Sequence, residues 1–354
     1  MKREGRFHEI DLLRFAAAFS VLLYHYTFRS AGTDIGLAVT FPELAPIFKY
    51  GYLGVELFFI ISGFVVLLTA LGRNARQFVV SRATRLYPAY WSCVAITFVT
   101  ILLLGGDLYS ATFPQFLVNL TMLQEFAKVS PIDGVYWTLT IELKFYLLVF
   151  LLVLARQIHH LQQFLGTWLL ASAFLDYFPG YNAIRFFLFS GYSYFFIAGA
   201  AFLLIRLHGI STYRLLLLAA SYVGALHFGV VEGATLAQSF HVEFDPLVIA
   251  LILSLFFAVF YLIALGKTKS LGRPGFVVIG ALTYPLYLLH QRIGFMLFNA
   301  LAPHAPRYVL LAVVIMSMIA LAYAVHRFIE RRYAGHLKRF VTYVLLLSSD
   351  KQAA

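Results

Sequence analysis

Three ionisable side chains interrupt an apolar stretch near the N-terminus, "IDLLRFAAAFSVLLYHYTF" at residues 10–28. An imidazole is close to neutral at pH 7 and can take a proton from a hydroxyl group, so His25 is a candidate general base. On an ideal α-helix Arg14 and His25 differ by about 20° and lie about 16 Å apart, with Asp11 within about 40° of the same stripe. Ionisable groups inside a membrane are costly and by default indicate a functional site. The alternative is a structural Asp–Arg pair and a histidine bonded to a neighbouring helix.

A carboxylate in a later apolar stretch could act with this histidine. In "VYWTLTIELKFYLLVFLL", Glu142 shares a helical face with Phe145 and Tyr146, at i+3 and i+4. Its expected depth overlaps that of His25, and a carboxylate beside an imidazole fixes its tautomer and raises its basicity. An ion pair between Glu142 and a basic residue elsewhere is the alternative.

Two further apolar stretches also contain polar groups. In "GYLGVELFFIISGF", Glu56 lies near the outer end and Ser62 in the middle. Glu56 could equally sit at the lipid headgroup boundary. In "GALTYPLYLLHQRIG", Tyr287 and His290 are one turn apart beside Pro285 and can line a cavity. His290 could instead be an interfacial anchor.

A basic segment, "RNARQFVVSRATRLYPAYW", follows the second apolar stretch. Arg82 and Arg85 are three residues apart and therefore share a helical face. Guanidinium groups offer paired donors that suit phosphate. Membrane topology and anionic lipid headgroups alone would also favour arginines here.

The elements that hold these residues are expected to be membrane-spanning helices. The chain has 354 residues, of which 61% are hydrophobic and 12% charged, and its mean hydropathy is +0.83. Its one cysteine excludes an internal disulfide, and no metal site is expected. The sequence predicts an all-α polytopic membrane helical bundle, because about ten stretches are long and apolar enough to span a bilayer. The expected spans lie near residues 10–29, 50–72, 88–106, 136–155, 163–178, 186–205, 213–231, 246–265, 275–298 and 308–327.

The distribution of charge sets the expected orientation. If both termini are cytoplasmic, most Lys and Arg residues fall inside, as the positive-inside rule requires. Only Arg29, Lys49, Lys128, Arg185 and Arg307 then fall in outer loops. The net charge of +11 thus reflects topology, and a nucleic-acid partner is not expected. We expect one transmembrane domain at 1–340 and a short tail at 341–354 that lies on the membrane surface.

Five short motifs in order resemble the signature of the acyltransferase 3 family of integral membrane acyltransferases. They are Arg14-x-x-Ala17-x-x-x-Val21-x-x-x-His25, "FFIISGF" (58–64), "RATRLYP" (82–88), "YWTLTIELKFY" (136–146) and "YPLYLLH" (284–290). The resemblance covers the first 146 residues and the ninth span.

This resemblance implies transfer of an acyl group, usually acetyl, from cytoplasmic acyl-coenzyme A to a hydroxyl of a glycan at the outer face of the bacterial inner membrane. It implies that His25 is catalytic, that Glu142 is essential beside it, and that arginines meet the coenzyme A phosphates. The implied acyl-CoA-binding residues are Arg14, Arg82 and Arg85. Supporting residues are expected at Asp11, Glu56, Ser62, Trp137, Tyr146, Tyr287 and His290.

Two other functions would use the same polar residues. A proton-coupled transporter or flippase of a glycan or lipid could use buried Arg, Glu and His as a proton relay. Such a protein would lack an obvious role for Arg82 and Arg85, and the sequence shows no inverted repeat. A membrane sensor without turnover is the third reading. Among acyl-transfer mechanisms, His25 could be a general base or could carry the acyl group itself.

Overall fold

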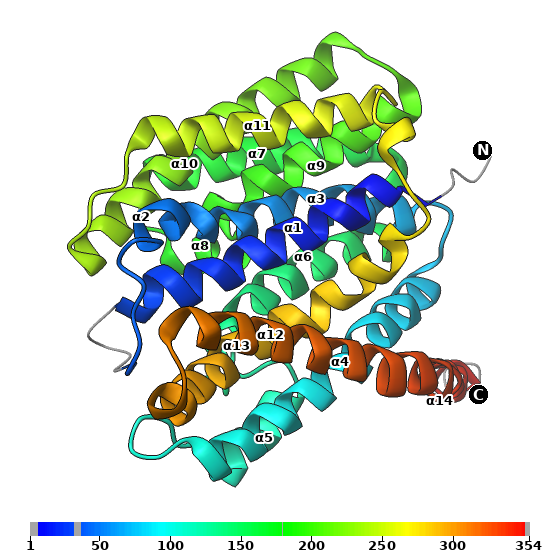
Figure 1. Ribbon diagram of the computed structural model, residues 1–354. Coiled ribbons are helices and arrows are strands. Elements are labelled where there is room, and N and C mark those ends of the chain that lie inside the picture. The colour runs from blue at the N-terminus through cyan, green and yellow to red at the C-terminus, as the bar shows by residue number, and fades with distance from the viewer. Residues whose placement is uncertain (1–5, 32–36, 179, 351–354) are drawn as a thin grey trace. The chain divides into compact units, whose positions relative to one another are not determined.

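The computed structural model describes residues 6–31, 37–178 and 180–350, and in these residues the secondary structure is helical, with no strand (Figure 1). Residues 351–354 of the expected tail lie outside the described part. Seven of the expected spans are confirmed as helical segments long and apolar enough to cross a membrane. These segments are Ala45–Ala70, Ala75–Leu104, Gly134–Leu154, Asn182–His208, Thr212–Phe240, Pro246–Ala264 and Arg307–Leu345.

Three expected spans are helical but do not meet these criteria of length and composition. They correspond to α1 (His8–Leu23), α7 (Leu161–Tyr177) and α12 (Phe276–Leu301). α1 has 16 residues, and α12 continues through Pro285. The chain is therefore a multi-pass membrane protein, and the part of it that the structure describes is helical.

The helices group into two compact units. The first unit comprises residues 1–17, 52–73 and 141–277, and the second comprises residues 18–51, 74–140 and 278–354. The first contains the start of α1, most of α6 (Trp137–Leu154), and α3 (Gly54–Ala70), α7, α8 (Asn182–Leu188), α9 (Ser190–His208), α10 (Thr212–Phe240) and α11 (Pro246–Ala264).

In the first unit α3 crosses α9 at very close range, and two glycines make this possible. A Cβ atom on Gly63 of α3 would overlap the carbonyl of Phe196, and one on Gly199 of α9 would overlap the carbonyl of Ile60. Small residues allow such close approach between membrane helices. The ring of Phe196 then packs against that of Phe145 in α6, with centroids 4.4 Å apart. Gly63 thus sets the position of α3, and with it the position of its neighbour Ser62.

Helix α11 shows why this unit needs a lipid environment. Its buried stripe contains Leu253 and Phe260. The opposite stripe is equally apolar, yet Leu247, Leu251 and Leu255, each one turn from the next, are exposed. A helix that is hydrophobic on all sides suits a bilayer, where lipid tails cover the outer face.

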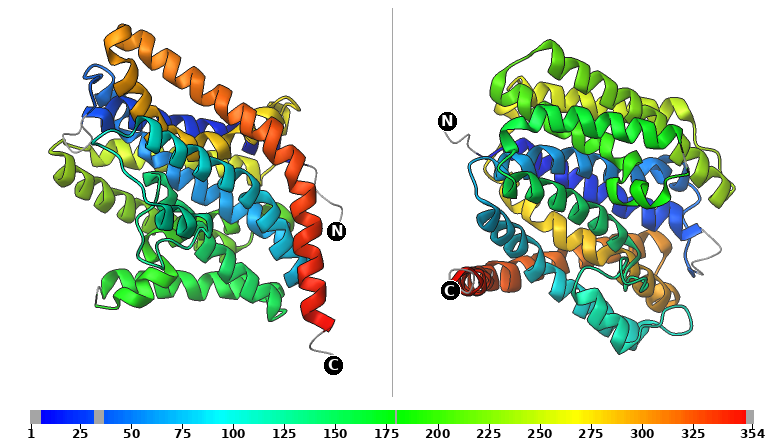
Figure 2. Two further views of the ribbon diagram at one scale, coloured as in Figure 1. Left: turned by 90° about the horizontal axis from the view of Figure 1, so that it is seen from below. Right: turned by 180° about the vertical axis from the view of Figure 1, so that it is seen from behind.

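The second unit contains the end of α1 and nearly the whole of α12. Its other elements are a π-helical turn η1 (Tyr24–Phe28), α2 (Ala45–Phe48), α4 (Ala75–Leu104), α5 (Phe113–Leu120), α13 (Arg307–Ala324), a second π-helical turn η8 (Val325–Glu330) and α14 (Arg331–Asp350). α13, η8 and α14 follow one another as one long helical rod, and α14 packs beside α4 (Figure 2). The expected boundary at 340/341 falls within α14.

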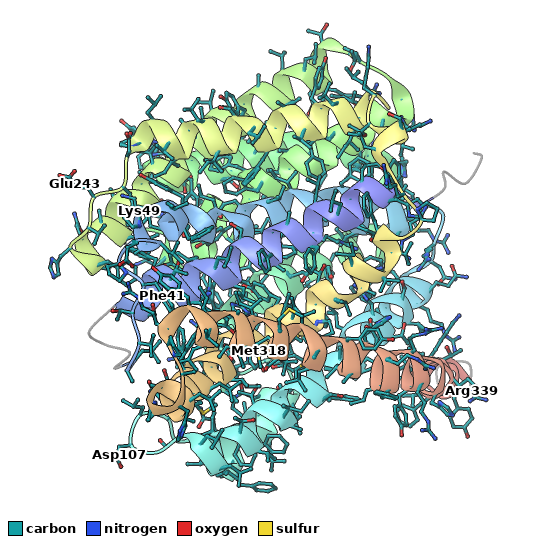
Figure 3. All side chains as sticks on the ribbon, in the orientation of Figure 1. Phe41, Lys49, Asp107, Glu243, Met318 and Arg339 are labelled. Carbon is teal, nitrogen blue, oxygen red and sulfur yellow. The ribbon has the colours of Figure 1, made fainter. Side chains whose placement is uncertain are left out.

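Buried aromatic and apolar side chains hold this second unit together, whereas the first half of α14 carries exposed basic side chains. Phe41 is buried and its ring lies 5.9 Å from that of Phe298 in α12. Met318 of α13 is also buried, while Arg339 projects from α14 (Figure 3).

The π-helical turn η1 corrects one expectation. The angle of about 20° between Arg14 and His25 assumed α-helical geometry up to residue 25. The α-helix ends at Leu23, and His25 lies in a wider turn, where each residue rotates the chain by less than 100°. Turns of this kind occur frequently at functional sites.

Candidate active site

His25 lies next to His290 in the second unit. Its Nδ1 atom is 2.8 Å from the carbonyl oxygen of Val21 and 3.0 Å from Nε2 of His290. The two ring centroids are 4.9 Å apart. His25 remains partly accessible, and its Nε2 forms no hydrogen bond with the described residues of its unit.

His290 is fixed by contacts on both its ring and its backbone. The ring is fully buried, at 0% exposure, and its Nδ1 lies 2.8 Å from the carbonyl oxygen of Tyr287. The hydroxyl of Tyr26 donates a 2.7 Å hydrogen bond to the His290 carbonyl. The Tyr26 ring fits because Gly294 has no side chain, and a Cβ there would overlap the hydroxyl. His290 is thus a buried part of this cluster and not an interfacial anchor.

Tyr287 is also positioned by a hydrogen bond, to Thr138 at the start of α6. Thr138 donates its hydroxyl hydrogen to the Val135 carbonyl, 3.0 Å away. The 3.1 Å contact between Thr138 and Tyr287 is therefore a bond that Tyr287 donates. Trp137, one residue earlier, is 38% exposed. The rings of Tyr287 and His290 lie with their centroids 5.7 Å apart, and their expected role in lining a cavity stays a prediction.

Asp133 is a buried carboxylate that the sequence reading missed. Its Oδ1 accepts the backbone N–H of Val135 at 3.1 Å, and its Oδ2 accepts that of Arg292 at 3.0 Å. Burial raises the pKa of Asp133 to about 6, while these two backbone bonds act in the opposite direction. Asp133 thus ties the segment before α6 to α12, two residues beyond His290. The sequence "DGVY", in which an aspartate precedes a short turn, could have indicated that Asp133 caps this turn.

Glu142 is held by two hydroxyl groups in the first unit. Tyr146, one turn along α6, donates a 2.5 Å hydrogen bond to Oε1, and Ser62 of α3 donates one of 3.1 Å to the same oxygen. The structure therefore brings three predicted residues, Ser62, Glu142 and Tyr146, together. His25 belongs to the other unit, so its pairing with Glu142 stays a prediction.

Glu56 also lies in the first unit, as a buried carboxyl group with only 1% of its surface exposed. Its interacting neighbour is Glu232 of α10, whose Oε1 accepts a 3.0 Å hydrogen bond from Tyr192. Glu56 is thus shielded from solvent by the residues of its own unit, while its depth in the bilayer stays a prediction.

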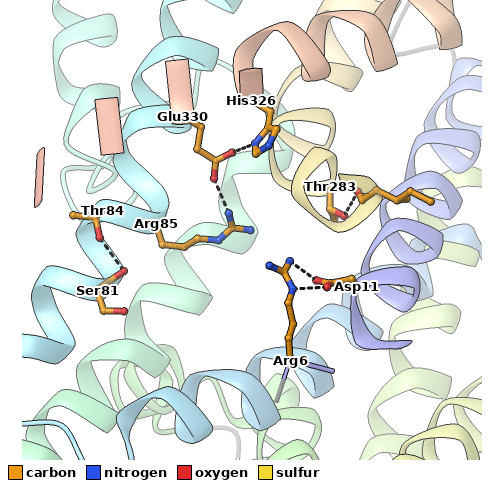
Figure 4. Close-up of polar contacts among 9 residues, drawn as sticks. Arg6, Asp11, Ser81, Thr84, Arg85, Thr283, His326 and Glu330 are labelled. Atoms are coloured by element: carbon orange, nitrogen blue, oxygen red, sulfur yellow. Dashed lines mark hydrogen bonds and ion pairs between the residues drawn. The ribbon is translucent and has the colours of Figure 1, made fainter. Parts of the chain in front are cut away.

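At the start of α1, Asp11 forms an ion pair with Arg6, a residue that was not among the predicted site residues. Asp11 accepts two hydrogen bonds from Arg6, of 2.7 Å from Nε and 3.1 Å from Nη2 (Figure 4). Arg14, on the same helix, is partly buried. The structural Asp–Arg alternative is thus realised for Asp11, with Arg6 as the partner.

Arg82 and Arg85 line one cavity between α4 and α14, as their shared helical face predicts. The cavity has a volume of about 430 Å³. Glu330 of η8 accepts a 2.6 Å bond from Arg85 and also contacts Nδ1 of His326 at 2.7 Å (Figure 4). The lining residues are Ser81, Arg82, Thr84, Arg85, Glu330, Ala334, Gly335 and Lys338.

This cavity contains polar residues that the sequence reading missed. His326 and Glu330 are four residues apart in "HRFIE", a spacing that would have indicated a helical pair. Lys338 gave no comparable signal. Three cations surround the cavity against one carboxylate, so it suits an anionic ligand. Among the described residues, no cluster of three His, Cys, Asp or Glu side chains could hold a metal ion.

Comparison with known proteins relates most of the sequence to one family. A family model described as an acyltransferase domain matches residues 7–327. The chain is 29% identical to nodulation protein 10 of Rhizobium leguminosarum bv. viciae over 198 residues, which is 48% of this chain and 52% of that protein. It is 28% identical to a peptidoglycan O-acetyltransferase of Listeria monocytogenes over 218 residues, 52% of this chain and 32% of that protein.

The chain therefore spans about half the length of the first relative and about a third of the second. No solved structure matches it. The family model covers both histidines of the cluster, both arginines of the cavity and Glu142. The chain thus belongs to the acyltransferase 3 family, whose acyltransferase domain extends over residues 7–327.

Proposed function

We propose that this protein is a bacterial inner-membrane O-acyltransferase. It moves an acyl group, in the simplest case acetyl, from cytoplasmic acyl-coenzyme A to a hydroxyl of an extracytoplasmic or lipid-linked glycan. The family supports acyl transfer, and a relative named as a peptidoglycan O-acetyltransferase supports a glycan acceptor. Both termini are proposed to be cytoplasmic, on the basis of the positive-inside rule.

The contact between the His25 ring and the Val21 carbonyl is the observation on which the proposal rests. The Val21 carbonyl can only accept a hydrogen bond, so the His25 Nδ1 atom beside it must carry the hydrogen. In a neutral imidazole Nε2 then has a free lone pair. A hydroxyl group that reaches Nε2 would lose its proton there as its oxygen attacks the thioester carbonyl. The C–S bond then breaks, and the proton passes from Nε2 to the thiolate of coenzyme A.

The cavity of Arg82, Arg85 and Lys338 is the proposed site for the phosphates of acyl-coenzyme A. Guanidinium groups bind phosphate oxygens in pairs, and Lys338 adds a third cation from α14. Arg14 is proposed to contact the same donor, and Glu142 to support His25. Membrane lipids surround the exposed apolar helix faces.

An acylation assay tests this function. The protein in detergent is given radiolabelled acetyl-coenzyme A and candidate glycans, and His25→Ala is compared with wild type. The matched control is His227→Gln, because His227 is exposed on α10. We expect transfer to fall about 100-fold or more in the His25 variant and to be unchanged in the control.

Three other outcomes would contradict either the role of His25 as a base or acyl transfer itself. Equal activity of His25→Ala would exclude His25 as the base. Movement of glycan across proteoliposomes without acylation would favour a transporter or flippase. Trapping of labelled acyl group on His25 after acid quench would make the histidine an acyl carrier.

A further inference from the structure

We infer that His290 is a positioning residue for His25: it accepts a hydrogen bond from the far side of the His25 ring and stabilises the cation that forms when His25 takes a proton. The inference rests on the proposed function of His25 as a base. It assigns His290 a role through His25, without contact to the substrate.

The hydrogen positions follow from the partners of each nitrogen. The Tyr287 carbonyl is an acceptor only, so the His290 Nδ1 atom 2.8 Å away carries a hydrogen. Nε2 of neutral His290 therefore has a lone pair and no hydrogen. Since Nδ1 of His25 carries the hydrogen, the 3.0 Å contact is a bond donated by His25 to His290. Which nitrogen of a histidine is protonated is set by the bond that its other nitrogen makes.

The surroundings fix the His290 ring in this accepting orientation. It is completely buried, and its backbone carbonyl is bonded to Tyr26, the residue next to His25. Because Gly294 leaves room for the Tyr26 ring, the segment that holds His25 and the segment that holds His290 are joined at two points. A base that is oriented by a third group is the arrangement that efficient proton transfer requires.

The same bond becomes stronger during the reaction. When Nε2 of His25 takes the hydroxyl proton, His25 becomes a cation and its Nδ1–H bond to His290 becomes charge-assisted. His290 stays neutral and keeps its own bond to Tyr287. A donor–acceptor bond that strengthens as charge develops lowers the barrier, whereas one of constant strength does not. The Val21 carbonyl accepts from the same Nδ1–H, and His290 adds the second acceptor.

Two substitutions separate this role from simple packing. His290→Gln can still place an amide oxygen where Nε2 accepts, whereas His290→Phe keeps a ring of similar size but has no acceptor. We expect His290→Phe to lower the turnover number by roughly tenfold or more. We expect the KM for acyl-coenzyme A to stay near that of wild type, and His290→Gln to recover most of the turnover.

A spectroscopic experiment tests the bond itself without any need for turnover. Full-length protein with ¹⁵N-labelled histidine rings is studied by NMR, and the His25 signals are assigned by their loss in His25→Gln. We expect His25 to carry its hydrogen on Nδ1 and to show ¹⁵N–¹⁵N coupling through that hydrogen to Nε2 of His290. Wild-type His25 with its hydrogen on Nε2 alone would overturn the inference, whatever the fate of His290→Phe.

The two hypotheses can fail separately. If wild type transfers acyl groups and His25→Ala does not, but folded His290→Phe turns over like wild type, the positioning role is wrong and the proposed function stands. If wild type shows no acyl transfer in any assay, the proposed function is wrong, and the role assigned to His290 falls with it even where the coupled histidines are observed.

Discussion

The hydroxyl of Tyr146 donates a 2.5 Å hydrogen bond to Oε1 of Glu142, one helical turn earlier in α6. Ser62 of α3 donates to the same oxygen. Because both donors meet on one carboxylate oxygen, the Glu142 side chain is held in a single orientation. Its other oxygen, Oε2, forms no hydrogen bond with the described residues of its unit. α3 itself is fixed by its close crossing with α9, so the direction of Glu142 depends on helix packing as much as on its own helix.

We predict that Glu142→Gln abolishes most acyl transfer, because an amide cannot supply the negative charge that supports an imidazolium ion. The loss should be on the order of 100-fold in turnover. Tyr146→Phe and Ser62→Ala should cause smaller losses, since each removes one bond that orients the carboxylate. The assay is turnover with acetyl-coenzyme A, with Glu243→Gln as the control because Glu243 is exposed. Full turnover in the Tyr146→Phe, Ser62→Ala double variant would contradict the orienting role.

The cavity between α4 and α14 predicts a defect in donor binding. Arg82→Gln, Arg85→Gln and Lys338→Gln should each raise the KM for acyl-coenzyme A, by about tenfold for an arginine that loses a charge-assisted bond to phosphate. Turnover at saturating donor should change little. Arg339→Gln is the control, since Arg339 is exposed on α14 and does not line the cavity. An equal change in KM for Arg339→Gln would assign the effect to general surface charge.

The crossing of α3 and α9 predicts a loss of stability. In Gly63→Ala the new Cβ atom meets the carbonyl of Phe196, a backbone atom that cannot move aside without moving its helix. We expect a destabilisation of about 1–3 kcal/mol, measured as a lower apparent Tm in detergent. Gly275→Ala is the matched control, because a Cβ there meets no atom within 4 Å. Equal apparent Tm values for the two variants would show that α3 has room to shift.

Asp133 predicts a pH dependence of stability. Its folded pKa of about 6 lies above the ordinary value of 3.8, so the native state binds this proton more tightly than the unfolded state. The associated stability is fully present below pH 3.8 and is lost as the pH rises through about 6. The total loss of folding free energy across this pH range is roughly 3 kcal/mol, because a shift of one pKa unit corresponds to about 1.36 kcal/mol.

The measurement compares wild type with Asp133→Asn from pH 5 to 7.5. Asparagine does not titrate, so the apparent Tm of wild type should fall relative to that of the variant as the pH rises. Parallel curves for the two proteins would mean that Asp133 has an ordinary pKa.

Local patterns were sufficient to predict several contacts. The i,i+4 spacing of Glu142 and Tyr146 predicts one face, and the structure places a hydrogen bond there. The i,i+3 spacing of Arg82 and Arg85 likewise places both on one cavity. Seven spans followed from hydropathy, because length and apolar composition are the physical requirements for crossing a bilayer.

Contacts between distant segments could not be predicted in this way. His25 and His290 are 265 residues apart, and Arg85 and Glu330 are 245 apart. A single sequence reports the period of a helix but not which helix lies beside it. The partner of Asp11 could not be predicted either, because Arg6 lies before the apolar stretch that contains Asp11.

The two π-helical turns have a consequence for how this chain tolerates changes in length. Each holds one residue more than an α-turn, and each has a histidine at its second position, His25 in η1 and His326 in η8. Deletion of Tyr24 would let the segment relax to an α-helix, and the residues beyond it would keep nearly the same face, because a turn with one residue fewer completes about the same rotation. His25 would then follow Leu23 directly and lose its place in the wider turn, although no residue of the cluster had been substituted. The π-helical turn therefore confines the effect of a one-residue deletion to the few residues that it contains.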